Sequence, residues 1–445
     1  MKRSGWRYLW KSEDIRKKLL ITLLLLAIYR FASNIPVPGI DREVVKQLTT
    51  ATGAAGSLIN LLDLLSGGAV SRFSILAMGV YPYITAQIIL QLLQPIIPAL
   101  ERKMQEDPRG GRIWMEKWTV FLTIPMAALS AIGQINIFNS MLGGNSVLSS
   151  FGFTGAKLLP TLASLFTMIA GTMLGVWLGQ LISEFGIRNQ GLSLIIFAGI
   201  VSRIPQNLYA LVTDEQTRWL IFIVIAILLL TIFAIVYIQQ GRRFVPVMFP
   251  GRRIGNRMSM PVKSNLPLMV NMAGMIPLIF AQSFLTFPAI LASFFMTSKT
   301  EWLANLAAST TQTFSGDSTW YPLMFFFLVV LFSYFYTDVL FAQQNYGDNL
   351  KKQGAQIPGV ARGAPTQRYL TKVQRRITLP GALSLGIIAV MPYIFGAFLP
   401  MGASQAGIFL VSSSGLLIVV GTVRDTFQII ETELKLHGYE DRLIS

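Results

Sequence analysis

The residues that usually carry catalysis or bind metals are scarce in this chain of 445 residues. It has no cysteine and a single histidine, His437. Disulfides, iron–sulfur clusters and thiol chemistry are therefore excluded, and almost no material is left for a zinc or haem site. The sequence contains no His-Glu-x-x-His motif, no pair of aspartates in facing apolar segments and no Ser/His arrangement. We expect no enzymatic activity, no cofactor and no bound metal.

Charged residues inside apolar segments are the next candidates for chemistry. Glu184, Asp338 and Arg203 lie near the ends of such segments, where a charge at the membrane surface is the ordinary interpretation. Arg30 and Arg424 lie deeper, and each could either reach the surface or make a functional contact. A transporter coupled to protons or ions usually keeps charges in mid-membrane. A secondary transporter and an intramembrane enzyme are therefore the less favoured alternatives.

Two long loops, at 239–264 and 343–376, hold six and seven basic residues. The first has no acidic residue and the second has only Asp348. A basic loop beside a membrane can simply set topology or attract anionic lipid. These loops are long and rich in Gly, Pro and Gln, which favours platforms for an acidic or RNA-containing partner. The candidate docking residues are Arg242, Arg243, Arg252, Arg253, Lys351, Lys352, Arg362, Arg368, Lys372 and Arg375.

Composition places these residues in a membrane protein. Hydrophobic residues make up 53% of the chain, and Asp, Glu, Lys and Arg only 13%, roughly half the share in soluble proteins. A transmembrane helix needs ~20 mainly apolar residues. Ten segments meet this need, at 19–34, 74–93, 114–135, 158–183, 192–212, 219–237, 264–298, 321–341 and, divided near 400–404, twice within 377–423.

The ten predicted spans divide into two sets of five, within residues 1–213 and 214–445. An odd number of spans in each set means that the second half is inverted relative to the first. Membrane proteins built this way work at the interface between their halves. No convincing internal sequence repeat is visible, so the prediction rests on topology. We expect an all-α polytopic membrane protein of two inverted five-helix halves.

The excess of positive charge orients these spans. The chain has 37 Lys and Arg against 21 Asp and Glu. Ten spans place both termini on one side, and we assign 30 of the 37 basic residues, Arg30 among them, to that side and seven, Arg72 among them, to the other. The positive-inside rule makes this side cytoplasmic, so we expect both termini in the cytoplasm.

Polar residues recur inside the second and seventh spans, at Thr85, Gln87, Asn271 and Gln282. Facing lipid they would be costly, so we expect them to face a partner helix or a wet path. Residues 57–66 are too short to span a membrane. They predict a short helix or re-entrant piece that ends at Gly67-Gly68.

Sequence blocks that follow one another along nearly the whole chain carry a family resemblance. They are Ile35-Pro36-Val37-Pro38-Gly39, Ala77-Met78-Gly79-Val80-Tyr81-Pro82, Leu194-Ile195-Ile196-Phe197-Ala198-Gly199, Asn271-Met272-Ala273-Gly274-Met275-Ile276-Pro277, Ile357-Pro358-Gly359-Val360 and Leu416-Leu417-Ile418-Val419-Val420-Gly421. Together they resemble the SecY family, the channel subunit of the bacterial protein-secretion translocon. The chain departs from the family's usual residues at Arg188, Gln190, Met269, Arg362 and Arg424.

The resemblance implies a channel for unfolded polypeptides with an apolar constriction. By motif, the constriction would be formed by Val80, Ile84, Ile196, Ile276, Ile279 and Ile418. The short helix at 57–66 would be the plug of the outer funnel, through Leu58, Ile59, Leu61, Leu62, Leu64 and Leu65. The second and third helices would face the seventh and eighth as a lateral gate. The polar residues Thr85, Gln87, Asn271 and Gln282 would moderate the opening of that gate.

The resemblance also implies partners and a location. The family assembles with the small membrane subunits SecE and SecG, and its basic loops engage the SecA motor ATPase or the ribosome. Secretory and membrane-protein nascent chains would be the cargo, and anionic lipids would surround the channel. We therefore expect a multi-pass protein of the bacterial plasma membrane.

Overall fold

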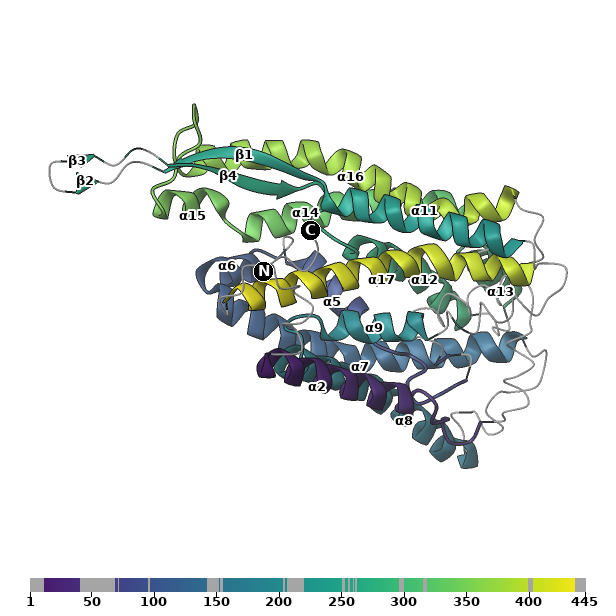
Figure 1. The fold of residues 1–445 in the computed structure, drawn as a ribbon. Coiled ribbons are helices and arrows are strands. Elements are labelled where there is room, and N and C mark those ends of the chain that lie inside the picture. Colours follow the sequence, from purple (N-terminus) through teal and green to yellow (C-terminus); the bar gives the residue numbers. More distant parts are fainter. Residues whose placement is uncertain are drawn as a thin grey trace.

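The computed structural model consists mainly of long helices packed side by side (Figure 1). It describes residues 12–40, 69–70, 72–94, 97–141, 152, 155–202, 205, 220–249, 253–254, 257–258, 260, 262–295, 300–314, 318–398 and 403–436. The predicted plug lies outside these residues, as does the predicted junction between the two halves.

A helix lies in each of the ten predicted spans. Their bounds are α2 (Glu13–Ala32), α5 (Tyr81–Leu93), α7 (Pro108–Met141), α8 (Leu158–Phe185), α9 (Gly191–Val201), α11 (Leu220–Gln240), α12 (Ile276–Ser293), α14 (Tyr321–Gln343), α16 (Ala364–Phe398) and α17 (Ala403–Leu436). Shorter helices are α6 (Pro98–Glu106), η1 (Gly155–Lys157), α13 (Glu301–Thr313) and α15 (Tyr346–Lys352). The mainly helical fold is thus confirmed.

Four helices of the described part are long and apolar enough to cross a membrane. They are Gly110–Asn139, Leu158–Phe185, Ile276–Ser293 and Tyr321–Lys352. The helices Gly191–Val201 and Leu229–Gln240 are apolar but shorter. The count of ten spans therefore stays a prediction.

The first basic loop folds as a β-hairpin, which the sequence analysis did not predict. Strand β1 (Arg242–Phe249) pairs antiparallel with β4 (Val262–Met269), and β2 (Arg253–Ile254) pairs with β3 (Arg257–Met258) farther out. The predicted seventh span began too early, because 264–269 belong to β4. The cause is a period of two: Val245, Val247 and Leu268 are buried, while Phe244, Pro246 and Pro267 beside them are exposed, as in a strand with one covered face.

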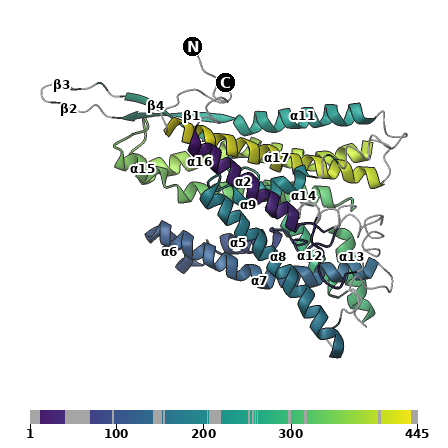
Figure 2. The same cartoon turned by 60° about the horizontal axis from the view of Figure 1, so that its bottom comes forward.

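The hairpin joins the two basic loops into one structure. Its buried valines pack with Phe341, Leu350 and Leu370, which belong to α14, α15 and α16. Met248 and Gln356 exchange two backbone hydrogen bonds, with N···O distances of 2.8 and 2.9 Å. Figures 1 and 2 show the hairpin extending past the helix ends beside α15. We call this structure, from β1–β4 to the start of α16, the basic platform.

The start of α2 and the end of α17 lie together at the same end of the bundle as the basic platform (Figure 1). The Lys18 Nζ is 2.7 Å from the Glu433 Oε1, and Ile15 packs with Leu434 beside this ion pair. The two ends of the described chain thus lie on one side of the bundle. Which side of a membrane this is stays a prediction.

Arg30 lies at the other end of α2, and its assignment to the predicted cytoplasmic side was wrong. Arg30 occupies the last turn of α2, and its backbone carbonyl accepts a hydrogen bond from Asn34. The Asn34 side chain in turn accepts a hydrogen bond from Arg72, which we assigned to the opposite side. Arg30 also lies in the far part of the predicted span 19–34, so that span gave no reason to count it with the amino terminus.

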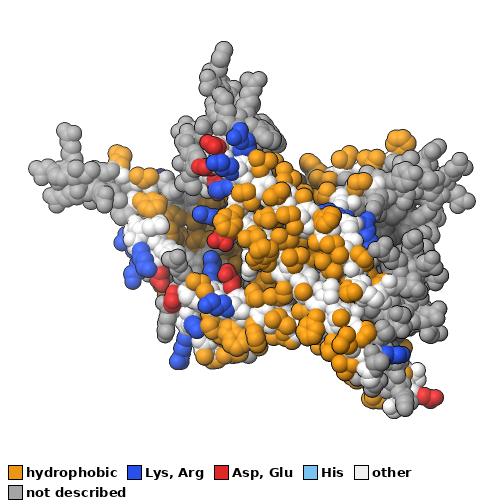
Figure 3. Space-filling model, turned by 90° about the horizontal axis from the view of Figure 1, so that it is seen from below, with side chains coloured by type: hydrophobic (Ala, Val, Ile, Leu, Met, Phe, Trp, Pro, Cys, Tyr) orange, Lys and Arg blue, Asp and Glu red, His pale blue; other side chains and the backbone are white. Residues whose placement is uncertain are grey.

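Apolar side chains cover the middle of one face of the molecule. Figure 3 shows one face on which hydrophobic side chains form a broad area, while basic and acidic side chains gather toward the end that carries the hairpin. A chain in water would not expose a continuous area of this kind. The surface is the one expected of helices surrounded by lipid, with charged residues at the level of the headgroups.

Candidate functional site

The six residues predicted for the constriction belong to one hydrophobic cluster. Val80, Ile84, Ile196, Ile279 and Ile418 are each at most 8% exposed, and Ile276 packs against them while partly buried. They come from the segment before α5 and from α5, α9, α12 and α17, so the cluster draws on both predicted halves. Residues up to 338 positions apart in the sequence therefore share one apolar centre.

The same local backbone feature positions the residues from α5 and α12. Each helix follows a glycine with positive φ, Gly79 at 53° and Gly274 at 64°, and a helix cannot pass through such a conformation. A proline then occupies the first turn of each helix, where its missing N–H costs nothing. Both sites read Gly-x-x-Pro, at 79–82 and 274–277.

This local repeat relates the two predicted halves, and the sequence analysis missed it. Ile84 and Ile279 each lie five residues after their glycine, and both belong to the same apolar cluster. The signal was visible in the sequence as two Gly-x-x-Pro motifs that each begin an apolar helix. It is only four residues long, which is too short to stand out in a search for whole-span repeats.

Close packing on α8 fixes the segment that carries Val80. A Cβ added at Gly171 would lie 1.9 Å from the carbonyl oxygen of Ile75, so only glycine allows this approach. One turn farther along α8, a Cβ at Gly175 would lie 3.6 Å from Val80. Small residues spaced by four let helices in a membrane approach this closely. Backbone contact with α8 thus holds residues 72–80 in place.

Three polar contacts join the predicted halves along one side, where α5 and α7 meet α12 and α14. The Tyr81 hydroxyl donates to the Ser283 carbonyl at 3.1 Å, and the Ser293 hydroxyl donates to the Gly133 carbonyl at 3.2 Å. Nearer the basic platform, the side-chain amides of Gln343 and Gln94 are 3.5 Å apart. Beside the contacts of Tyr81 and Ser293, the side chains of Tyr81 and Ile290 form a small apolar cluster. We call this contact the α5/α12 seam.

The four predicted gate residues lie on α5, on α12 and in the turn before α12, and they do not bond to one another. Thr85 donates to the Tyr81 carbonyl within α5. Asn271 binds both the N–H and the carbonyl of Gly274, so it shapes the turn before α12. Gln282 is buried and Gln87 is partly exposed. The hydrogen bonds across the seam come instead from Tyr81, Ser293 and Gln343, which the sequence analysis did not select as gate residues.

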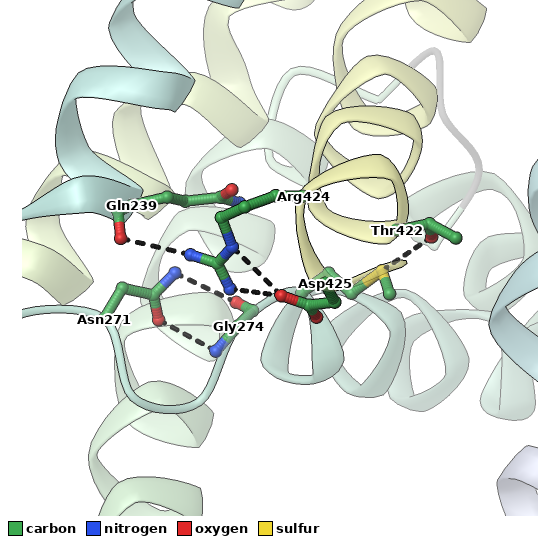
Figure 4. A network of polar contacts seen from close by, with 7 residues as sticks. Gln239, Asn271, Gly274, Thr422, Arg424 and Asp425 are labelled. Atoms are coloured by element: carbon green, nitrogen blue, oxygen red, sulfur yellow. Dashed lines mark hydrogen bonds and ion pairs between the residues drawn. The ribbon is translucent and has the colours of Figure 1, made fainter. Parts of the chain in front are cut away.

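A polar network lies one turn from Ile418 and holds α17 against α11 (Figure 4). The Arg424 guanidinium donates to the Gln239 carbonyl at 3.1 Å and pairs with Asp425 at 2.6 Å. The Thr422 hydroxyl donates to the Met275 sulfur at 3.7 Å, next to Ile276. Arg424 is 19% exposed, so its charge makes a structural contact here instead of extending freely to the surface.

The predicted docking residues fall into two groups. Arg242 and Arg243 begin β1, Lys351 and Lys352 end α15, and all are exposed on the basic platform together with Arg362. Arg253 lies in β2, and Arg252 is outside the described residues.

The second group lies on the flank of α16. Arg368, Lys372 and Arg375 line a groove of about 670 Å³ between α14 and α16. Two hydrogen bonds from the Arg375 Nε to Asp338, each 3.1 Å, raise the pKa of this guanidinium further above its usual range.

Comparison with known proteins decides the family. The SecY family model matches residues 74–427. The chain belongs to the SecY family. A protein translocase subunit SecY from Streptomyces scabiei is 36% identical over 440 residues, with 97% of both chains covered. The protein of that name from Aquifex aeolicus is 35% identical over 438 residues, again with 97% of both chains covered.

Solved structures agree with this fold of the SecY family. A structure described as a protein conducting channel has a TM-score of 0.62, covering 99% of this chain and all of its own, at 15% identity. The Sec61 protein in a canine ribosome–channel complex has a TM-score of 0.59 with 99% of this chain covered, also at 15% identity. At such low identity these likenesses concern the fold, whereas the SecY relatives carry the family assignment.

Proposed function

We propose that this chain forms the channel of the bacterial secretory translocon, which passes unfolded polypeptides across the plasma membrane and releases apolar segments into lipid. The observation that carries the proposal is that Val80, Ile84, Ile196, Ile279 and Ile418 all belong to one buried apolar cluster built from both halves. Membership of the SecY family over nearly the full length supports it. Such a role is non-enzymatic, because energy comes from a separate motor or from translation.

The six residues of the cluster would form the constriction. Aliphatic side chains offer no fixed charge or hydrogen bond that would trap a passing polypeptide. When no polypeptide is present, such a ring can dewet and close, which opposes the leakage of ions. The predicted plug at 57–66 would add a second seal on the outer side.

The α5/α12 seam would be the lateral gate between the halves at 1–213 and 214–445. It is held by a few hydrogen bonds, each contributing about 1 kcal/mol, and by the small cluster at Tyr81 and Ile290. A contact this limited can separate without unfolding either half. A sufficiently apolar segment of cargo would then pass into lipid.

The basic platform would receive the SecA motor or the ribosome on the cytoplasmic side. Arg242, Arg243, Lys351, Lys352 and Arg362 present their charges on a folded support that protrudes beyond the helices. Phosphate-rich RNA and acidic protein surfaces are attracted by such clusters. The small subunits SecE and SecG would cover part of the apolar surface, and both termini would be cytoplasmic.

Site-specific crosslinking tests the constriction, because the chain has no cysteine of its own. Single Ile84→Cys, Ile279→Cys and Ile418→Cys variants should each form a disulfide with a cysteine placed in a stalled secretory chain. The matched control is Leu230→Cys on α11, whose side chain is 57% exposed on the outer surface. Equal crosslinking at the control and the cluster would refute the constriction.

Charge reversal tests the platform. Arg242→Glu combined with Arg243→Glu should weaken binding of SecA or ribosomes to reconstituted channels, and raising the salt concentration should abolish the difference from the unchanged protein. Arg112→Glu combined with Lys117→Glu on α7 changes the charge equally away from the platform. Equal loss of binding in both variants would assign these charges a general electrostatic role.

A further inference from the structure

The groove between α14 and α16 carries features that the docking of a soluble partner leaves unexplained. We propose that it binds the headgroup of an anionic phospholipid, with an acyl chain lying against the apolar part of α16. The groove is lined by Tyr334 of α14 and by Arg368, Lys372, Arg375, Arg376 and Leu379 of α16. Its volume of about 670 Å³ lies in the range of sites for small ligands.

The exposed face of α16 changes character at this groove. Arg368, Lys372 and Arg376 are exposed in successive turns, and the same face continues as Leu379 and Ile387, which are 50% and 54% exposed. On α14, the exposed Leu331 lies one turn from Tyr334. An aliphatic surface that begins where the basic residues end marks the boundary between hydrocarbon and headgroups. The groove spans this boundary. A soluble partner bound there would therefore contact the lipid bilayer.

The charges in the groove favour an anionic ligand. Four basic side chains face one nearby carboxylate, Asp338, which is already bound to Arg375 with an N–O distance of 2.9 Å. Within the described residues, no carboxylate lies within ion-pair distance of Arg368, Lys372 or Arg376. Arginine and lysine together suit a phosphate, since one offers a planar pair of donors and the other a compact charge. Basic pockets between membrane helices bind lipid headgroups in this way.

The ion pair between Arg375 and Asp338 adds a prediction of tighter lipid binding, opposite to the loss expected when a basic residue is removed. Asp338 holds this guanidinium by contacts to both carboxylate oxygens and thereby competes with any anionic ligand. Asp338→Asn removes one negative charge and releases Arg375 toward the groove. Binding of an anionic lipid should become tighter, about fivefold for one added charge near the headgroup layer. If the ion pair had a purely structural role, Asp338→Asn should instead weaken the binding of an anionic lipid.

The test uses the full chain, purified in detergent, with bound lipids counted by native mass spectrometry during titration with phosphatidylglycerol, cardiolipin or phosphatidylcholine. We expect preference for the two anionic lipids. Lys372→Gln combined with Arg376→Gln should weaken their binding about 30-fold, since two charges are lost. Arg112→Gln combined with Lys117→Gln on α7 is the matched control and should change binding less than about twofold. Inorganic phosphate at the same concentration should not compete.

A second measurement separates this proposal from partner docking. The thermal transition of the purified chain should rise when cardiolipin is added, and the Lys372→Gln/Arg376→Gln variant should lose most of that rise while its transition without lipid is unchanged. Equal lipid binding by this variant and the unchanged chain would overturn the proposal. So would competition by inorganic phosphate, which indicates a free-anion site. If the variant loses binding to SecA or ribosomes but keeps lipid binding, the groove belongs to the docking surface.

Discussion

The hydrogen bond from Tyr81 to Ser283 gives the sharpest test of the proposed gate. Tyr81 is 4% exposed, and its hydroxyl donates across the α5/α12 seam at 3.1 Å. Tyr81→Phe removes the hydroxyl and keeps the ring, so the apolar burial at the seam is unchanged. The closed seam should lose about 1 kcal/mol, the usual net contribution of one such bond. The open population should therefore rise about fivefold.

Ser283 offers the probe for this opening. Its hydroxyl is buried and makes no hydrogen bond within the described part, and Tyr81 donates to its backbone carbonyl. Ser283→Cys is therefore nearly isosteric, and the new thiol is unique in a chain without cysteine. Its alkylation by a membrane-permeant maleimide should proceed only when the seam opens, so the rate reports the open population.

The comparison is between Ser283→Cys alone and the same variant with Tyr81→Phe. We expect alkylation about fivefold faster in the double variant. Tyr83→Phe is the matched control, because Tyr83 lies on the same helix and is not among the residues that bond across the seam in the described part of the chain. Equal rates with and without Tyr81→Phe would refute the reasoning. Equal acceleration by Tyr83→Phe would show that loosening of α5 in general, and not this bond, controls access.

Three further predictions concern stability and sealing. Arg424→Met leaves Asp425 partly buried without its partner, so it should lower the free energy of unfolding by about 2 kcal/mol and reduce the melting temperature in detergent. Gly171→Val places a side chain against the Ile75 carbonyl and should sharply reduce folded yield. In contrast, Gly421→Ala, with its nearest neighbours at 3.6 Å, should be tolerated. Ile279→Asp places a charge in the apolar cluster and should raise ion conductance through reconstituted channels, whereas Ile279→Leu should leave the conductance low.

Much of the candidate site could be predicted from the sequence, because the motifs that carry the resemblance also carry the residues of the apolar cluster. All six predicted residues lie in that cluster. Their assignment to a constriction remains a prediction of function. The α5/α12 seam was predicted less well. Polar residues in the second and seventh spans were predicted to moderate the gate, but the bonds that cross the seam come from Tyr81, Ser293 and Gln343. Rotation of a helix about its axis decides such contacts, and composition does not report it.

The basic loops illustrate the same limit. Their charge was evident, but the fold that supports it was not. The alternation at Val245, Val247 and Leu268 is typical of a strand, yet three residues are a weak signal within a loop of Gly, Pro and Arg. The two bonds between Met248 and Gln356 join loops that lie about 100 residues apart in the sequence. Only the folded chain shows that the two loops form one platform.

The sequence by itself determined that this chain is mainly helical, that its helices are apolar enough for a membrane, and that its charge gathers near particular loops. These properties depend on local composition and periodicity, which each segment carries with it. The tertiary structure decided which side chains cross the α5/α12 seam and that Arg30 lies near Arg72. It also separated the platform from the groove between α14 and α16. These features depend on contacts between distant segments, so no single segment contains them.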